Sequence, residues 1–148
     1  MAERDFAVVE DFIVADLASA FPALATVKGV IHVAKNRWPQ SNWDTYLGTS
    51  ATAETAFALV TRIGGAENGV STDYPVLDIS LLSRNLNFAG SLAESIRTRY
   101  TRYPRLVKHG GRSLVLGKAR TLLGPHPAPW TDESMHHVHS SYEFRARR

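Results

Sequence analysis

The segment from Phe57 to Tyr103 constrains the fold more than any other part of the chain. Residues 57–63 alternate with the period of two that is typical of a β-strand, and residues 76–82 do the same. Gly64-Gly65 interrupts the first pattern, and a second turn signal follows before the next strand begins. We therefore expect an antiparallel hairpin with a long loop at about 64–75.

Two segments have the periodicity of amphipathic helices. Residues 5–20 and 84–103 each place apolar side chains on one stripe, and each is followed by a helix-ending proline, Pro22 or Pro104. The two stripes consist of Phe6, Val9, Phe12, Ile13, Leu17 and Ala20, and of Leu86, Ala89, Leu92, Ala93, Ile96 and Tyr100. We expect both helices to pack on a sheet through these stripes.

Further strand patterns lie on either side of this segment. Residues 113–123 predict a strand bulged at Gly117, and residues 27–33 are compatible with a short strand. Residues 124–130 (GPHPAPW) indicate a rigid, proline-rich connection without the character of a central strand. Residues 137–147 then alternate almost to the end of the chain, which predicts a strand with one polar face.

These elements predict a single domain spanning residues 1–148, since a chain of this length holds one core. The expected fold class is α/β of the α+β kind. It has a small mixed, mainly antiparallel sheet of about four strands, with two amphipathic helices packed on it. The absence of cysteine excludes disulfides and thiolate metal sites. No apolar run approaches the roughly 18 residues of a membrane span.

The charge is mildly basic, with a formal net charge of +3 and a pI near 9.4. The basic residues gather between Arg97 and Arg120 and at the C-terminus, whereas acidic residues dominate the first twenty positions. Such asymmetry is compatible with a nucleic-acid surface, and equally with an acidic face that meets a neighbour's basic face. The helical arginines are either a basic edge for phosphates or a solvated face that forms salt bridges between subunits.

Two loops are the candidate contact regions. The first, at about 34–56, carries Trp38, Trp43 and Tyr46 among polar residues, and rings of this type are enriched at protein–protein contacts. The alternative is that these rings cap the domain's own core. The second is the hairpin loop at 64–75, which lacks the order of a phosphate-binding loop and is better interpreted as a protruding tip that contacts another chain.

No catalytic or metal-binding set is evident. His137 and His139 share one face of the last strand, but a zinc site needs a third ligand from elsewhere, and a polar strand edge is the better interpretation. Serine, histidine and aspartate are present without a G-x-S-x-G motif. We therefore predict no catalytic residue, no metal and no cofactor.

Several motifs together resemble one known family. In chain order they are TRIGG, DYPVLDISLL, AGSLAESIRTRY, GPHPAPW and SSYEFRARR. This arrangement is similar to the tail terminator proteins of long-tailed, siphovirus-type bacteriophages, especially those of actinobacterial hosts. The resemblance covers about residues 5–147 and is best at 59–100 and 121–147, whereas the 26–55 segment is more individual.

The resemblance implies a virion protein that assembles in the host cytoplasm as a homo-hexameric ring at the head-proximal end of the tail. Such a ring contacts the major tail tube protein, ends tube polymerisation and joins the tail to the head-completion proteins of the neck. DNA passes through its lumen without sequence-specific binding, and neither a membrane nor enzymatic activity is involved. The alternatives are another neck-ring component, such as a head–tail adaptor or stopper, or a small basic nucleic-acid-binding domain.

On this interpretation, twelve residues are candidate contacts with neighbouring subunits, tube or neck proteins. They are Trp38, Trp43, Tyr46, Arg62, Gly64, Gly65, Asn68, Asp73, Tyr74, Trp130, Arg145 and Arg147.

Overall fold

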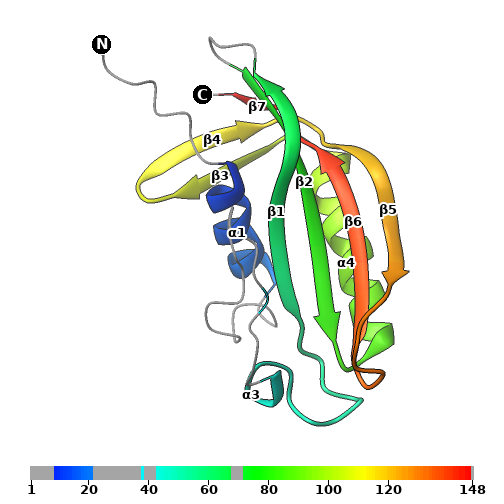
Figure 1. Cartoon of the computed structure of the whole chain (residues 1–148). Helices are drawn as coiled ribbons and strands as arrows, with labels where there is room; N and C mark the ends of the chain where they lie inside the picture. The colour runs from blue at the N-terminus through cyan, green and yellow to red at the C-terminus, as the bar shows by residue number, and fades with distance from the viewer. Residues whose placement is uncertain (1–8, 22–37, 39–42, 68–71, 148) are drawn as a thin grey trace.

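The structure, a computed structural model, describes residues 9–21, 38, 43–67 and 72–147 (Figure 1). Its helices are α1 (Val9–Ala20), α3 (Trp43–Leu47) and α4 (Leu86–Arg102). Its strands are β1 (Phe57–Glu67), β2 (Thr72–Ser83), β3 (Arg105–His109), β4 (Arg112–Leu116), β5 (Arg120–Ala128), β6 (His136–Glu143) and β7 (Ala146–Arg147). The short strand considered at 27–33 lies outside the described residues.

The seven strands form one sheet, and the fold is α+β, as expected. The central strand is β2, which pairs with β1 along one edge and with β6 and then β7 along the other. Beyond these, β5 borders β6, β4 borders β7, and β3 pairs with β4. Every strand pair in the described part of the chain is antiparallel, so local hairpins account for much of the connectivity.

The prediction of about four strands was too low. The predicted strand at 113–123 is interrupted between β4 and β5, where the N–H of Gly117 donates to the carbonyl of Arg145 at 2.8 Å. The last strand is likewise divided into β6 and β7, and β3 has no counterpart among the predicted strands. β5 also extends to Ala128, into the predicted proline-rich connection; its prolines fit a strand at the edge of the sheet.

The two long helices pack on the same face of the sheet. α4 contacts β2, β5 and β6, and α1 contacts β1 and β3. In Figure 1, α4 passes behind the strands. The predicted stripes are buried in the shared core through Val9, Phe12, Ile13, Leu17, Ala89, Leu92, Ala93, Ile96 and Tyr100. Leu86 is 49% exposed because it occupies the first position of α4, and Ala20 at the end of α1 is only partly buried. Phe6, the first residue of the predicted stripe, lies outside the described residues.

The boundaries of α4 follow from local chemistry. The side chain of Asn85 accepts a hydrogen bond from the N–H of Phe88 at 3.1 Å, which satisfies one of the free donors at the start of the helix. At the other end, Tyr103 is extended because it precedes Pro104. The helix therefore lies within the predicted 84–103 segment.

One carboxylate joins the two long helices. Asp16 on α1 accepts hydrogen bonds from Nε and Nη2 of Arg99 at 2.8 and 2.7 Å and from the hydroxyl of Tyr100 at 2.5 Å. Burial opposes ionisation of Asp16, but the hydrogen bonds from Arg99 and Tyr100 outweigh it and lower its pKa. Burial, together with the charge of Asp16, raises the pKa of Tyr100, so the phenol remains a donor.

We expect Asp16→Ala to lower the free energy of unfolding by about 3 kcal/mol at pH 7, because it leaves Arg99 and Tyr100 without their acceptor. The folded-state pKa of Asp16 lies below the unfolded value of 3.8, so this contribution is present above that pH and is lost as pH falls through the folded pKa. Denaturant unfolding at pH 7 and below pH 3.8 measures both effects. The matched control is Glu94→Ala, which breaks an exposed pair with Arg97 and should cost less than about 1 kcal/mol. Equal losses in the two variants would contradict this assignment.

The β1–β2 hairpin is longer than the sequence predicts, and this corrects the loop expected at 64–75. Gly64 and Gly65 lie in β1, paired with Val76 and Pro75, after a register shift that follows Arg62. Asp73 and Tyr74 lie in β2. Asn68 falls outside the described residues, between the two strands. A β-bulge, not a loop, therefore accounts for the pair of glycines.

The two glycines have different roles. Gly65 has φ +115°, and a Cβ built on it would lie 2.1 Å from the carbonyl oxygen of Tyr74 and 2.7 Å from Cα of Pro75. No atom lies within 4 Å of the corresponding position at Gly64. Only Gly65 is required by the close approach of the two strands.

We expect Gly65→Ala to lower the free energy of unfolding by at least about 2 kcal/mol, because the new methyl group meets backbone atoms and the residue adopts a conformation that favours glycine. Gly64→Ala is the matched control and should change stability by less than about 1 kcal/mol. Thermal unfolding of the two variants under the same conditions makes the comparison. Equal destabilisation would show that the bulge itself, and not the approach of Tyr74, is the constraint.

Candidate functional site

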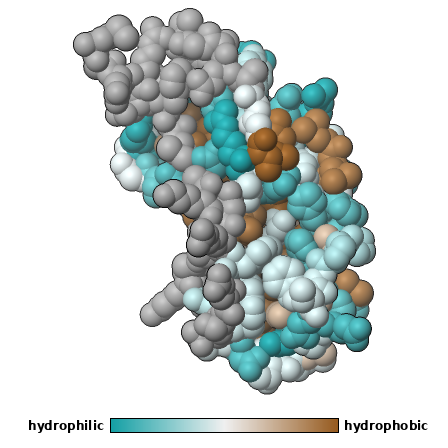
Figure 2. Space-filling model, in the orientation of Figure 1, coloured by the Kyte–Doolittle hydropathy of each residue, from teal (hydrophilic) through white to brown (hydrophobic). Residues whose placement is uncertain are grey.

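One face of the sheet carries neither of the two long helices. Successive strand residues point to opposite faces, and the core side chains Val60, Ile79 and Tyr142 point toward α1 and α4. Their neighbours in sequence therefore point the other way. We call this side of the sheet the open face; Figures 1 and 2 view it, with α4 behind the strands.

The open face carries exposed apolar side chains. Leu106 on β3 and Val115 on β4 are cross-strand partners, 55% and 44% exposed, while their neighbours Val107 and Leu114 are buried on the other side. Ile63 is 55% exposed at the bulge of β1, and Leu123 is 46% exposed on β5. Figure 2 shows brown surface over β1 and along β5, interspersed with teal. The surface is thus a mixture of apolar and polar groups, as at many protein–protein contacts.

Three predicted contact residues join this surface. Phe144 and Ala146 are buried in the core, so the exposed Arg145 and Arg147 lie on the open side. Arg147 is opposite Val115 in the strand register. Tyr74 alternates with the buried Asp73 and is half-buried on the same side.

Ile63, Leu106 and Val115 were missed as contact candidates. For the β3–β4 pair, the signal was present in RLVKHGGRSLVL, which alternates on both sides of a Gly-Gly turn.

A polar cluster occupies the middle of the open face. Asp78 lies 3.1 Å from Nε2 of His139 and accepts a hydrogen bond from the hydroxyl of Ser141. The ring of His126 packs edge-on against that of His139, with centroids 5.3 Å apart. Here the carboxylate lies between the serine and the histidine, whereas activation of a serine requires the histidine in that position. Within the described ranges, no group of three or more potential ligand residues could hold a metal ion.

The predicted aromatic residues converge at one end of the sheet. Trp38, Trp43 and Tyr46 each contact the buried ring of Phe57, with centroids 5.3 to 5.6 Å away, and Trp130 packs on both tryptophans. The region expected to be an irregular loop at 34–56 includes the short helix α3. These rings cap the domain's own core, which is the alternative left open by the sequence. All four retain partial exposure, so contact with a partner stays a prediction.

Arg84 holds this aromatic cluster in place, and its role was not foreseen. Its guanidinium donates to the carbonyl of Gly48 at 2.6 Å, to Asp44 at 2.6 Å and to the hydroxyl of Ser134 at 2.8 Å. These partners lie 36 to 50 residues away in sequence. No local pattern marks such an interaction, so only the fold shows it.

Arg62 and Asp73 have structural partners within the chain. Two hydrogen bonds of 2.9 Å join the guanidinium of Arg62 to the carboxylate of Asp73, which connects β1 to β2. Nη1 of Arg62 also lies 3.9 Å from Glu10 of α1. Glu10 is buried, one of its oxygens has no hydrogen-bond donor, and burial raises its pKa despite the nearby guanidinium. The cluster therefore anchors the hairpin to α1.

We expect Glu10→Gln to raise the unfolding midpoint at pH 7 by a few degrees. The raised folded-state pKa means that the protonated form is favoured on folding, so stability is lost as pH rises from the unfolded value of 4.5 through the folded pKa. Glutamine avoids this cost, and the two proteins should converge below pH 4.5. Thermal unfolding across this range tests the idea, with Asp11→Asn as a control on the same helix. A variant less stable than the wild type at pH 7 would show that the Arg62 contact outweighs burial.

Comparison with known proteins gives no assignment. No model of a known protein family matches the chain, and no curated protein matches it. Among the helices of the described part of the chain, none is both long and apolar enough to span a bilayer.

Proposed function

We propose that this chain is a structural subunit of a bacteriophage neck ring. In this role it caps the head-proximal end of the tail tube, ends tube polymerisation and joins the tail to the head-completion proteins. The proposal rests on the resemblance of the five motifs to tail terminator proteins. The number of six subunits per ring is implied by that resemblance alone. DNA would pass through the lumen without sequence reading.

The open face is the observation that supports this role best. Leu106, Val115, Ile63 and Leu123 leave apolar surface in water beside Arg145 and Arg147. Exposed apolar surface of this kind, mixed with charge, is typical of a face that another protein covers. A ring of identical subunits uses two different surfaces of each copy, and it closes when the rotation between neighbours permits.

The β3–β4 hairpin is the part of the open face best suited to mutation. Leu106 and Val115 lie opposite one another and are both exposed, so replacing them should not disturb the core. We expect Leu106→Lys combined with Val115→Lys to fold normally and to reduce ring assembly on the tail tube at least about tenfold, because lysine is disfavoured at the core of an interface. Electron microscopy of particles and native mass spectrometry of the subunit with tube protein measure this outcome.

One control tests whether the open face is the contact surface, and a second tests whether the protein caps the tail. Leu86→Lys changes an exposed leucine of α4, on the other side of the sheet, and should leave assembly intact. Particles made without the protein should have overlong or unjoined tails. Adding the wild-type chain should restore tails of normal length that are joined to heads. Normal tails on empty heads, or a stable monomer in the presence of tube and neck proteins, would overturn the tail-capping role. Tight, salt-sensitive binding to short duplex DNA would favour a nucleic-acid-binding domain instead.

A further inference from the structure

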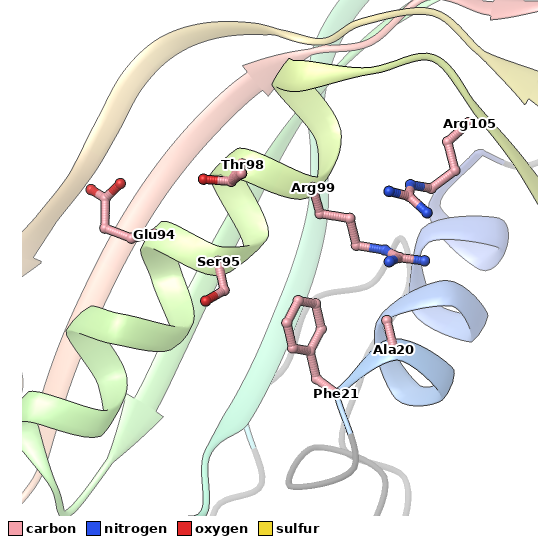
Figure 3. A pocket seen from close by; sticks show the side chains of 7 residues that line it. All are labelled: Ala20, Phe21, Glu94, Ser95, Thr98, Arg99 and Arg105. Atoms are coloured by element: carbon pink, nitrogen blue, oxygen red, sulfur yellow. The ribbon is translucent and has the colours of Figure 1, made fainter.

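A groove of about 410 Å³ lies between α1 and α4, on the side of the sheet opposite the open face. The end of α1 forms one wall and the second half of α4 the other, while Arg105 enters from the start of β3 (Figure 3). Its lining includes Phe21, Glu94, Ser95, Thr98, Arg99 and Arg105. The proposed ring assembly does not use these residues.

The groove has a guanidinium without an acceptor. The side chain of Arg105 forms no hydrogen bond or ion pair with the described part of the chain, and its Nε is buried without a partner. A buried donor left unsatisfied costs about 1–3 kcal/mol, so such groups normally have partners. In Figure 3 the guanidinium of Arg105 points toward that of Arg99 across the end of the groove.

The charges around these two side chains do not balance. Asp16 neutralises Arg99 through two hydrogen bonds. The positive charge of Arg105 also lowers the pKa of Asp16. Asp16 is nevertheless a single carboxylate beside two guanidinium groups. Glu94, on the opposite part of the lining, is already paired with Arg97 at 2.9 Å. Counted over the described residues, the end of the groove nearest Arg105 therefore carries excess positive charge.

The rest of the groove selects among anions. The ring of Phe21 packs against the core and lies beside Arg99 in Figure 3, which offers an apolar surface next to the charge. A free phosphate would leave this ring uncovered and would bring two negative charges toward Glu94. A carboxylate attached to an apolar segment satisfies both features, since guanidinium and carboxylate pair with two parallel hydrogen bonds.

We propose that this groove binds an acidic segment of a partner protein. One carboxylate of the segment lies against Arg105 and the remaining donors of Arg99, and a neighbouring apolar side chain covers Phe21. The proposal is independent of the ring, because it concerns a different face of the molecule and requires no self-assembly.

Titration of the ¹⁵N-labelled protein with a short peptide of alternating glutamate and leucine tests the proposal. We expect chemical-shift changes confined to the residues that line the groove, including the Nε signals of Arg99 and Arg105. Arg105→Gln should weaken binding about tenfold or more, because it removes the charged hydrogen bonds. Arg102→Gln, which removes an exposed arginine at the end of α4, should change the affinity less than about twofold.

Further probes distinguish the alternatives. Acetate has the carboxylate without an apolar side chain, so it should cause only weak shifts in the groove. Phe21→Ala should weaken binding of the glutamate–leucine peptide and leave the shifts caused by acetate unchanged. A lysine–leucine peptide should produce no shifts in the groove. Equal losses in Arg105→Gln and Arg102→Gln, or shifts spread over the whole surface, would overturn the proposal. Binding of inorganic phosphate as tight as that of the peptide would also overturn it, in favour of a phosphate site. Thermal unfolding confirms that Arg105→Gln remains folded.

Discussion

The ionised carboxylate of Asp16 is the interaction on which the arrangement of the molecule depends. It receives hydrogen bonds from Arg99 and Tyr100, which lie on a helix more than eighty positions later in the sequence. It joins α1 to α4, whose apolar stripes are both buried on the same face of the sheet. A network of this kind is favourable because the carboxylate receives three hydrogen bonds from groups that are already ordered by packing.

Placing both helices on one face has two structural results. The strands present their other face without a long helix, and exposed leucine and valine side chains remain there beside arginines. A groove also lies between the end of α1 and the second half of α4, where the side chain of Arg105 has no acceptor among the described residues. One subunit thus has two chemically different surfaces on opposite sides. This suits a protein that contacts unlike neighbours at the same time.

Local periodicity predicted those parts of the fold whose partners are close in sequence. The stripe of α4, the alternation of β6 and the pairing of β1 with β2 follow from side-chain spacing, which the backbone geometry imposes directly. The β3–β4 hairpin carried the same signal in a shorter form and was missed. Gly65 illustrates a different difficulty, since a glycine pair indicates a loop and a close strand approach equally well until the opposite strand is placed.

The candidate contact residues also divide into those that local alternation assigns and those that only the tertiary structure assigns. Tyr74, Arg145 and Arg147 could be assigned to the open face by alternation alone, whereas Arg62 and Asp73 have each other as partners, a choice that only tertiary structure reveals. The sequence grouped Trp38, Trp43 and Tyr46 but not Trp130, and it could not decide between a partner and the chain's own core. Phe57 decides where they pack, because its buried ring lies at the centre of the cluster.

That cluster also determines how the protein interacts with light. The chain has three tryptophans, and the indole rings of Trp38, Trp43 and Trp130 all lie within 5.3 to 6.0 Å of one another, with Phe57 in contact with two of them. Rings this close share their excited states, so the tryptophan bands of the near-ultraviolet circular dichroism and the tryptophan fluorescence arise from one end of the sheet as a single coupled signal. Melting of that end would be visible at once, whereas events at the groove between α1 and α4 would leave the emission unchanged.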